Sequence, residues 1–219
     1  MEKIIVINQK MYFNSLSEIT KFQDDLNIYK DKIIVLPSYL YIENFISKGY
    51  KVGSQNVSDE ISGAHTGEVS AESLKDLGVL YTLIGHKEVR EKYSEDIQKK
   101  INLALQNNLK VILCIGENKG EDPKKHIKSE LENLNLNQNV IISYEPNWAI
   151  GSNITPSVND IEDISNYIKS LTGLKVLYGG SVNEENINDL SKLNLDGFLI
   201  GSKSKDSSSL KKIIEVSLK

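Results

Sequence analysis

The stretch Asp96–Ile115, DIQKKINLALQNNLKVILCI, decides the fold because it holds both halves of a repeating unit. Its first half, Asp96–Gln106, has apolar residues at the three- and four-residue spacing of an amphipathic helix. Those residues are Ile97, Ile101, Ala104 and Leu105. Its second half contains Val111–Ile115, a short apolar run typical of a buried strand. The stretch therefore predicts a helix followed by a strand.

The same alternation recurs along the whole chain. Eight short apolar or β-branched runs occur, at Ile4–Ile7, Ile33–Leu36, Lys51–Gly53, Leu80–Ile84, Val111–Ile115, Val140–Ser143, Lys175–Tyr178 and Gly197–Ile200. Further helical patterns lie between them, at Ser17–Leu26, Val158–Leu171, Asn183–Leu193 and Ser209–Val216. The 219 residues give about 27 per unit, close to the size of one strand and one helix. Eight units without a large extra segment favour a closed (β/α)8 barrel over an open sheet, so we expect residues 1–219 to form a single α/β domain.

Composition narrows the class of protein. The chain is 39% hydrophobic and 26% charged, which is typical of a globular domain. Its net charge of −4 argues against a nucleic-acid partner, and no apolar run is long enough to span a membrane. Cys114 is the only cysteine, which excludes an intrachain disulfide and a cysteine-based zinc site. Arg90 is the only arginine, which we attribute to codon bias. We expect a cytoplasmic protein without a signal sequence.

Polar residues at the ends of the predicted strands are the candidates for chemistry, because barrel active sites form there. Asn8 and Lys10 follow the first run, His86 the fourth and Glu145 the sixth. Glycines and serines follow the seventh and eighth runs, at Gly179, Gly180, Ser181, Gly201 and Ser202. Backbone N–H groups there can hold an anion. Taken alone, each feature also has a purely structural interpretation: a solvated lysine, a hydrogen-bonded structural histidine, or glycines that relieve steric crowding. Together they predict acid–base chemistry beside an anion site.

At these residues the chain resembles the triosephosphate isomerase family over essentially its whole length. The matching stretches are Asn8–Lys10, Gly63–Ser70, Ile84–His86 with Glu88, Cys114–Glu117, Tyr144–Gly151, Leu177–Asn183 and Asp196–Gly201. The stretches Tyr144–Gly151 and Leu177–Asn183 are highly specific. The resemblance implies interconversion of dihydroxyacetone phosphate and D-glyceraldehyde 3-phosphate through an enediolate.

The resemblance also assigns roles to individual residues. Glu145 would be the base, His86 a neutral imidazole that polarises the carbonyl, and Lys10 the cation that stabilises the enediolate. Asn8 would help to position Lys10, and Glu88 would pair with it. No metal or organic cofactor is implied.

The remaining implied features are a lid, a phosphate site and a partner subunit. Pro146–Ile150 would close over the substrate and exclude water. The backbone at Gly151, Ser181, Gly201 and Ser202 would hold the phosphate. The third loop, with Thr66, would reach into the mouth of a second copy, so we expect a homodimer or a larger even oligomer.

The chain departs from the family pattern at a few positions. Lys87 stands where the family usually has serine, and Ser202 where it usually has glycine. The lid continues with Gly151–Asn153, which reads Gly-Ser-Asn where the family commonly has Gly-Thr-Gly. The segments from Cys114 to Glu145 and from Glu145 to Tyr178 are shorter than is typical of the family. We expect the ammonium of Lys87 to approach Glu145 and to weaken it as a base; the alternative is that Lys87 faces solvent or pairs with another acid.

Three functional hypotheses remain open from the sequence. The first is an active isomerase. The second is a divergent homologue that binds phosphate or a protein partner with little turnover. The third is another barrel enzyme acting on phosphosugars, which should lack the Glu145–Trp148 lid motif that this chain has.

Overall fold

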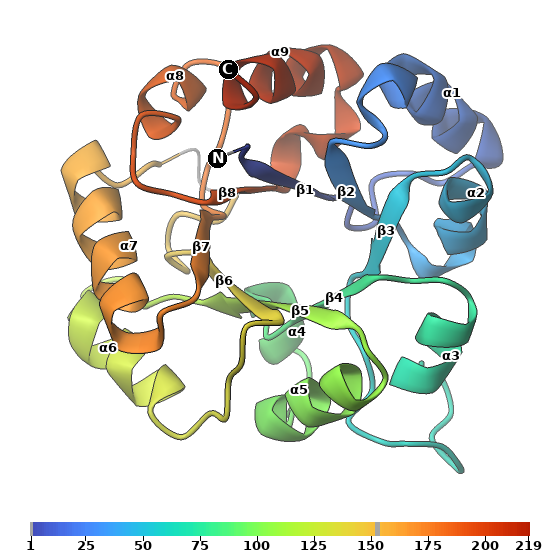
Figure 1. Cartoon of the computed structure of the whole chain (residues 1–219), viewed down its shortest axis with the longest axis horizontal. Coiled ribbons are helices and arrows are strands. Elements are labelled where there is room, and N and C mark those ends of the chain that lie inside the picture. The colour runs from blue at the N-terminus through green and yellow to red at the C-terminus, as the bar shows by residue number, and fades with distance from the viewer. Residues whose placement is uncertain (1, 152–153) are drawn as a thin grey trace.

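Eight parallel strands close into a barrel in the computed structural model, which describes residues 2–151 and 154–219 (Figure 1). The strands are β1 (Ile4–Asn8), β2 (Ile33–Leu36), β3 (Lys51–Ser54), β4 (Tyr81–Ile84), β5 (Lys110–Ile115), β6 (Val140–Tyr144), β7 (Lys175–Tyr178) and β8 (Gly197–Ile200). Neighbours in the chain are neighbours in the sheet, and β1 pairs with β8 to close it. All eight predicted strands and the closed barrel are confirmed.

Helices surround the barrel on the outside (Figure 1). They are α1 (Leu16–Leu26), α2 (Ile42–Ser47), α3 (Ala71–Asp76), α4 (Lys87–Arg90), α5 (Ile97–Gln106), α6 (Pro123–Leu131), α7 (Val158–Thr172), α8 (Ile187–Leu190) and α9 (Ser207–Ser217). Three short 3-10 turns join them, η1 (Asn27–Tyr29), η2 (Tyr39–Tyr41) and η3 (Ser202–Lys205). The predicted helices begin where side chains cap them: Ser15, Asp96, Ser157 and Asp206 each accept a backbone N–H of the first turn.

The helix predicted over Asn183–Leu193 is much shorter than its pattern indicates. Only Ile187–Leu190 is helical. The side chain of Asn183 accepts the backbone N–H groups of Glu185 and Asn186, which folds the start of the segment into a turn instead. Ile187 and Leu190 are nevertheless fully buried. The apolar pattern therefore predicted the buried residues correctly, but it predicted too long a helix.

The apolar core has two layers. Alternate strand residues fill the barrel interior, namely Val6, Ile34, Leu36, Leu83, Ile112, Cys114, Ile141, Leu177 and Leu199. A larger layer lies between the barrel and the helices and includes Phe22 and Phe45. Because the interior is packed with side chains, a substrate can bind only at the rim.

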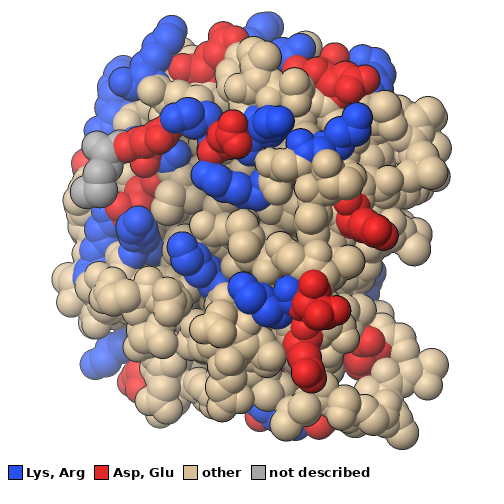
Figure 2. Space-filling view, turned by 45° about the vertical axis from the view of Figure 1, so that its right-hand side comes forward, with Lys and Arg blue, Asp and Glu red and all other residues tan. Residues whose placement is uncertain are grey.

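The surface carries charges of both signs. Figure 2 shows lysine and arginine side chains interleaved with aspartate and glutamate on one face. Within the part of the chain that the structure describes, no helix is long and apolar enough to cross a bilayer.

Candidate active site

The carboxyl ends of the strands bring the predicted acid–base residues together. His86 follows β4 and Glu145 follows β6, and both side chains are buried. His86 Nε2 lies 3.6 Å from Glu145 Oε2. Lys10, after β1, forms an ion pair of 2.7 Å with Glu88, two residues beyond His86. The structure therefore places Lys10, His86, Glu145 and Glu88 around one mouth.

Local hydrogen bonding fixes the form of the His86 ring. Its Nδ1 accepts the backbone N–H of Glu88 at 3.3 Å. A nitrogen that accepts a hydrogen bond carries no proton, so the neutral ring holds its proton on Nε2. That N–H is directed to the Glu145 side of the mouth, where it can donate to an oxygen placed between them.

Glycines at the strand ends make room for Glu145. A Cβ atom on Gly179 would lie 2.5 Å from Glu145 Cγ, and one on Gly116 would lie 2.0 Å from the Glu145 carbonyl oxygen. Glu145 Oε1 is buried and accepts no hydrogen bond from the described residues. This oxygen is therefore free to accept a proton from a bound molecule.

Lys10 is held in a strained conformation. Its φ of 47° lies in the left-handed region that residues with a side chain rarely adopt. The Asn8 side chain accepts the Lys10 N–H at 3.0 Å, and Gln55 Nε2 donates to the Lys10 carbonyl at 2.8 Å. Burial is the largest single influence and raises the pKa of Glu88, but the hydrogen bond and charge of Lys10, together with the charges of His86 and Lys92, outweigh it and lower the pKa of Glu88. The charged pair holds the lysine side chain in place.

The four expected phosphate-binding residues lie in three neighbouring segments. Gly151 ends the described part of the lid, and its φ of 68° requires glycine-like freedom. Ser181 follows β7 and is buried, with its carbonyl accepting from Asn186 Nδ2 at 2.6 Å. Gly201 and Ser202 follow β8 and begin the η3 turn. A Cβ on Gly201 would lie 3.1 Å from Lys10 Cε, so this turn borders the catalytic mouth. The departure at Ser152 and Asn153 lies outside the described residues.

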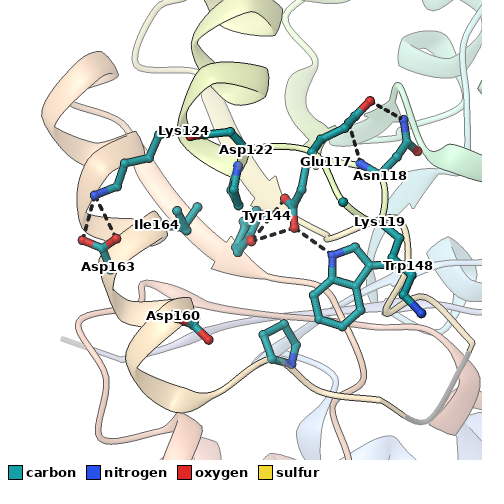
Figure 3. Close-up of a pocket in the computed structure, with 14 residues that line it drawn as sticks. Glu117, Asn118, Lys119, Asp122, Lys124, Tyr144, Trp148, Asp160, Asp163 and Ile164 are labelled. Carbon is teal, nitrogen blue, oxygen red and sulfur yellow. Dashed lines mark hydrogen bonds and ion pairs between the residues drawn. The ribbon is translucent and has the colours of Figure 1, made fainter.

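The beginning of the lid is fixed to the loop that follows β5. Trp148 Nε1 donates to Glu117 Oε1 at 2.9 Å, and the Tyr144 hydroxyl donates to Glu117 Oε2 at 3.3 Å (Figure 3). Burial and the nearby Glu117 raise the pKa of Tyr144, so this hydroxyl stays a donor. Beside these side chains lies a cavity of about 580 Å³, which Trp148 borders together with Glu117 and Tyr144 (Figure 3).

The expected approach of Lys87 to Glu145 is wrong. The Lys87 ammonium donates to the Asn147 carbonyl in the lid at 2.9 Å and lies 3.5 Å from Glu91 Oε1. Among the described residues its ion pair is with Glu91, one turn along the chain, which confirms the alternative that it pairs with another acid. The contact with the lid carbonyl was not predicted, because it depends on how two loops meet.

Arg90 supports the site in a way that sequence analysis missed. Its guanidinium donates to the Gly85 carbonyl at 2.6 Å and to the Cys114 carbonyl at 3.0 Å, and it pairs with Glu130 at 2.5 Å. It thereby ties the end of β4 to that of β5. The signal that could have drawn attention to it was its being the only arginine in the chain.

Thr66 lies apart from this mouth within its own subunit. It is exposed in the long segment between β3 and α3, which Figure 1 shows extending away from the barrel. Its predicted role belongs to an assembly of two chains, and it stays a prediction.

A closed parallel barrel with a buried carboxylate, an imidazole and a lysine around its mouth defines a barrel enzyme of acid–base chemistry. The chain belongs to the triosephosphate isomerase family, which matches it over residues 3–217. It is accordingly an intramolecular isomerase that acts on triose phosphate.

Similar proteins support this membership over nearly the full length. The triosephosphate isomerase of a Wolbachia species from Brugia malayi is 36% identical, covering 98% of this chain and 97% of its own. That of Mycoplasma mobile is 38% identical and covers 93% and 95%. That of Mycoplasmopsis agalactiae is 36% identical and covers 99% and 97%.

Proposed function

We propose that Glu145, His86 and Lys10 carry the interconversion of dihydroxyacetone phosphate and D-glyceraldehyde 3-phosphate, a step of glycolysis and gluconeogenesis. Glu145 removes a proton from the carbon beside the carbonyl and returns it to the neighbouring carbon. The observation that carries this proposal is the buried Glu145 carboxylate 3.6 Å from the His86 ring, with one of its oxygens unpaired among the described residues.

His86 and Lys10 stabilise the charge that this proton transfer creates. As the proton leaves carbon, negative charge develops on the carbonyl oxygen, and the Nε2–H of His86 donates to it. The same ring then moves protons between the two oxygens of the enediolate. The Lys10 ammonium adds electrostatic stabilisation, while Asn8 and Glu88 hold it in position. These steps call for no metal or organic cofactor.

The phosphate binds to the backbone at Gly151, Ser181, Gly201 and Ser202. The closeness of Gly201 to Lys10 supports this, because it brings a glycine turn and a cation to the same side of the mouth. Closure of Pro146–Ile150 over the bound phosphate excludes water from the enediolate.

The enzyme functions in the cytoplasm as a homodimer or larger even oligomer. The segment that carries Thr66 supports this assembly, because its Ile61 side chain is 64% exposed in a single copy. A second copy would cover such residues and receive Thr66 beside its Asn8 and Glu88.

Glu145→Gln tests the proposed base. The amide keeps the size of the side chain but cannot accept the proton, so kcat should fall by at least about 100-fold. A coupled assay with D-glyceraldehyde 3-phosphate measures turnover, and binding of glycerol 3-phosphate, which has no carbonyl, should persist. His86→Gln should also lower kcat rather than raise KM alone. Near-native turnover of Glu145→Gln would remove this residue as the base, and poor turnover of the unaltered chain would favour the divergent homologue.

A further inference from the structure

Lys87 connects the segment that carries His86 to the lid. It directly follows His86 and begins α4, yet its ammonium reaches the Asn147 carbonyl at 2.9 Å. Only 30% of its side chain is exposed, so most of the aliphatic stem is covered. A cavity of about 20 Å³, bordered by Lys87, Glu145 and Asn147, has room for a single water. Lys87 therefore lies near the base without pairing with it.

Asn147 is also held from the opposite side, by the loop after β5. Its backbone N–H donates to the Glu117 carbonyl at 2.9 Å, and its side-chain amide donates to the Gly116 carbonyl at 2.7 Å and to Asn118 Oδ1 at 3.1 Å. These bonds satisfy the backbone and side-chain donors of Asn147, and Lys87 donates to its backbone carbonyl. Two loops thus grip the first turn of the lid.

Asn147, the residue held by both loops, lies two residues after Glu145 and one before Trp148. Glu145 is itself fixed by its N–H bond to the Ile115 carbonyl at 2.8 Å. Movement of the lid relative to Glu145 would turn the chain close to Asn147, the residue whose carbonyl Lys87 holds. Trp148 follows at once and is bound to Glu117 in the same arrangement.

We propose that Lys87 is a positioning residue that holds the first turn of the lid in the conformation in which Glu145 faces His86. This inference rests on the proposed roles of Glu145 and the lid. Lys87 acts through the Asn147 carbonyl, and its charge-assisted hydrogen bond favours this lid conformation over those in which the carbonyl turns away.

Lys87→Met tests this role, because it keeps the length of the side chain and removes the donor. We expect KM and the dissociation constant of glycerol 3-phosphate to rise about tenfold, equivalent to about 1.4 kcal/mol. We expect kcat to change less, because saturating substrate restores the lid conformation. Lys87→Arg keeps a cationic donor and should recover most of the affinity. Glu91→Gln removes only the exposed ion pair and should behave like the unaltered enzyme.

Trp148 gives an independent readout, because it is the only tryptophan of the chain. Its emission should shift in free Lys87→Met as the indole leaves Glu117, and should return on addition of glycerol 3-phosphate. The acid limb of the pH–rate profile should stay unchanged.

Two outcomes would overturn the proposal. Unchanged emission with a shifted acid limb would mean that Lys87 acts on Glu145 by charge. Unchanged emission, affinity and rate would make Lys87 an ordinary surface lysine. The emission and binding measurements do not depend on which residue is the base. Full activity of Glu145→Gln would contradict the proposed function and would leave those measurements valid.

Discussion

The thiol of Cys114 lies in the barrel interior, close enough to the proposed base Glu145 to interact with it. Burial, together with the charge and hydrogen bonding of Glu145, raises the pKa of this thiol well above its usual range. A raised pKa favours the protonated thiol, and the protonated form is a poor nucleophile. This environment is that of a packed rather than a reactive cysteine.

We therefore expect Cys114 to resist thiol reagents in the folded protein. An aromatic disulfide reagent at pH 8 should modify it at least about 100-fold more slowly than in protein unfolded by guanidinium. The folded protein keeps the reagent away from the thiol and keeps the thiol protonated. Absorbance of the released thiolate measures the rate. Equal rates in the two states would show that the interior opens readily or that the thiol ionises.

The residues proposed to react were easier to identify from the sequence than the residues that support them. Lys10, His86 and Glu145 could be located because each follows a predicted strand, and the register of a barrel brings strand ends together. The supporting residues Gln55 and Arg90 could not be located in this way, because their contacts join distant segments. Gln55 holds the Lys10 carbonyl, and Arg90 joins β4 to β5. The contact of Lys87 with the lid is of the same kind, and the sequence pattern suggested the wrong partner.

At the scale of elements, the strands were predictable and the ends of the helices less so. A strand buried on both faces leaves a continuous apolar run, whereas α8 is cut short because the Asn183 side chain accepts the backbone N–H groups of Glu185 and Asn186. The buried pair of Lys100 and Glu95 also shows the limit of periodicity. Lys100 lies beside the apolar face of α5 and is covered because Glu95 and Asn56 bind its ammonium.

The turn after β7 illustrates how an element end shapes the site. Gly179 adjoins both Glu145 and Ser143, and an added Cβ would lie within 2.6 Å of atoms of each. Gly179→Ala should therefore displace the base from His86, lowering kcat at least about tenfold and stability by about 1–3 kcal/mol. Gly120→Ala is the control: its φ of 89° strains an alanine, but nothing lies within 4 Å of the new methyl.

The coupled assay and thermal unfolding together check the Gly179 prediction. Gly120→Ala should lose stability while keeping its turnover. If Gly179→Ala keeps full turnover, the packing of this turn against Glu145 does not set the position of the base.

At the scale of the whole molecule, apolar side chains are exposed on loops that share one side of the mouth. Met11 follows β1, Leu40 follows β2, Ile61 follows β3 and Tyr93 follows α4, and each is more than 60% exposed. Because β1 to β4 are consecutive in the barrel, these loops are neighbours. Large exposed apolar residues on adjoining loops indicate a surface that associates with another protein. In the proposed homodimer, a second copy of the chain would cover these residues and also receive the projecting Thr66 segment.

Thr66→Arg tests this assembly, because a bulky cation at the tip of the segment would have to enter the partner's mouth beside Lys10. The substitution should leave the barrel folded but shift the sedimentation coefficient from that of a dimer to that of a monomer at micromolar concentration. Turnover should fall with it, because Lys10 and its neighbours would lose the contacts that fix them. Ser170→Arg, on the exposed surface of α7, introduces the same charge away from the segment and should change neither property. If the unaltered chain sediments as a fully active monomer, the exposed loops have another partner and the site is complete within one subunit.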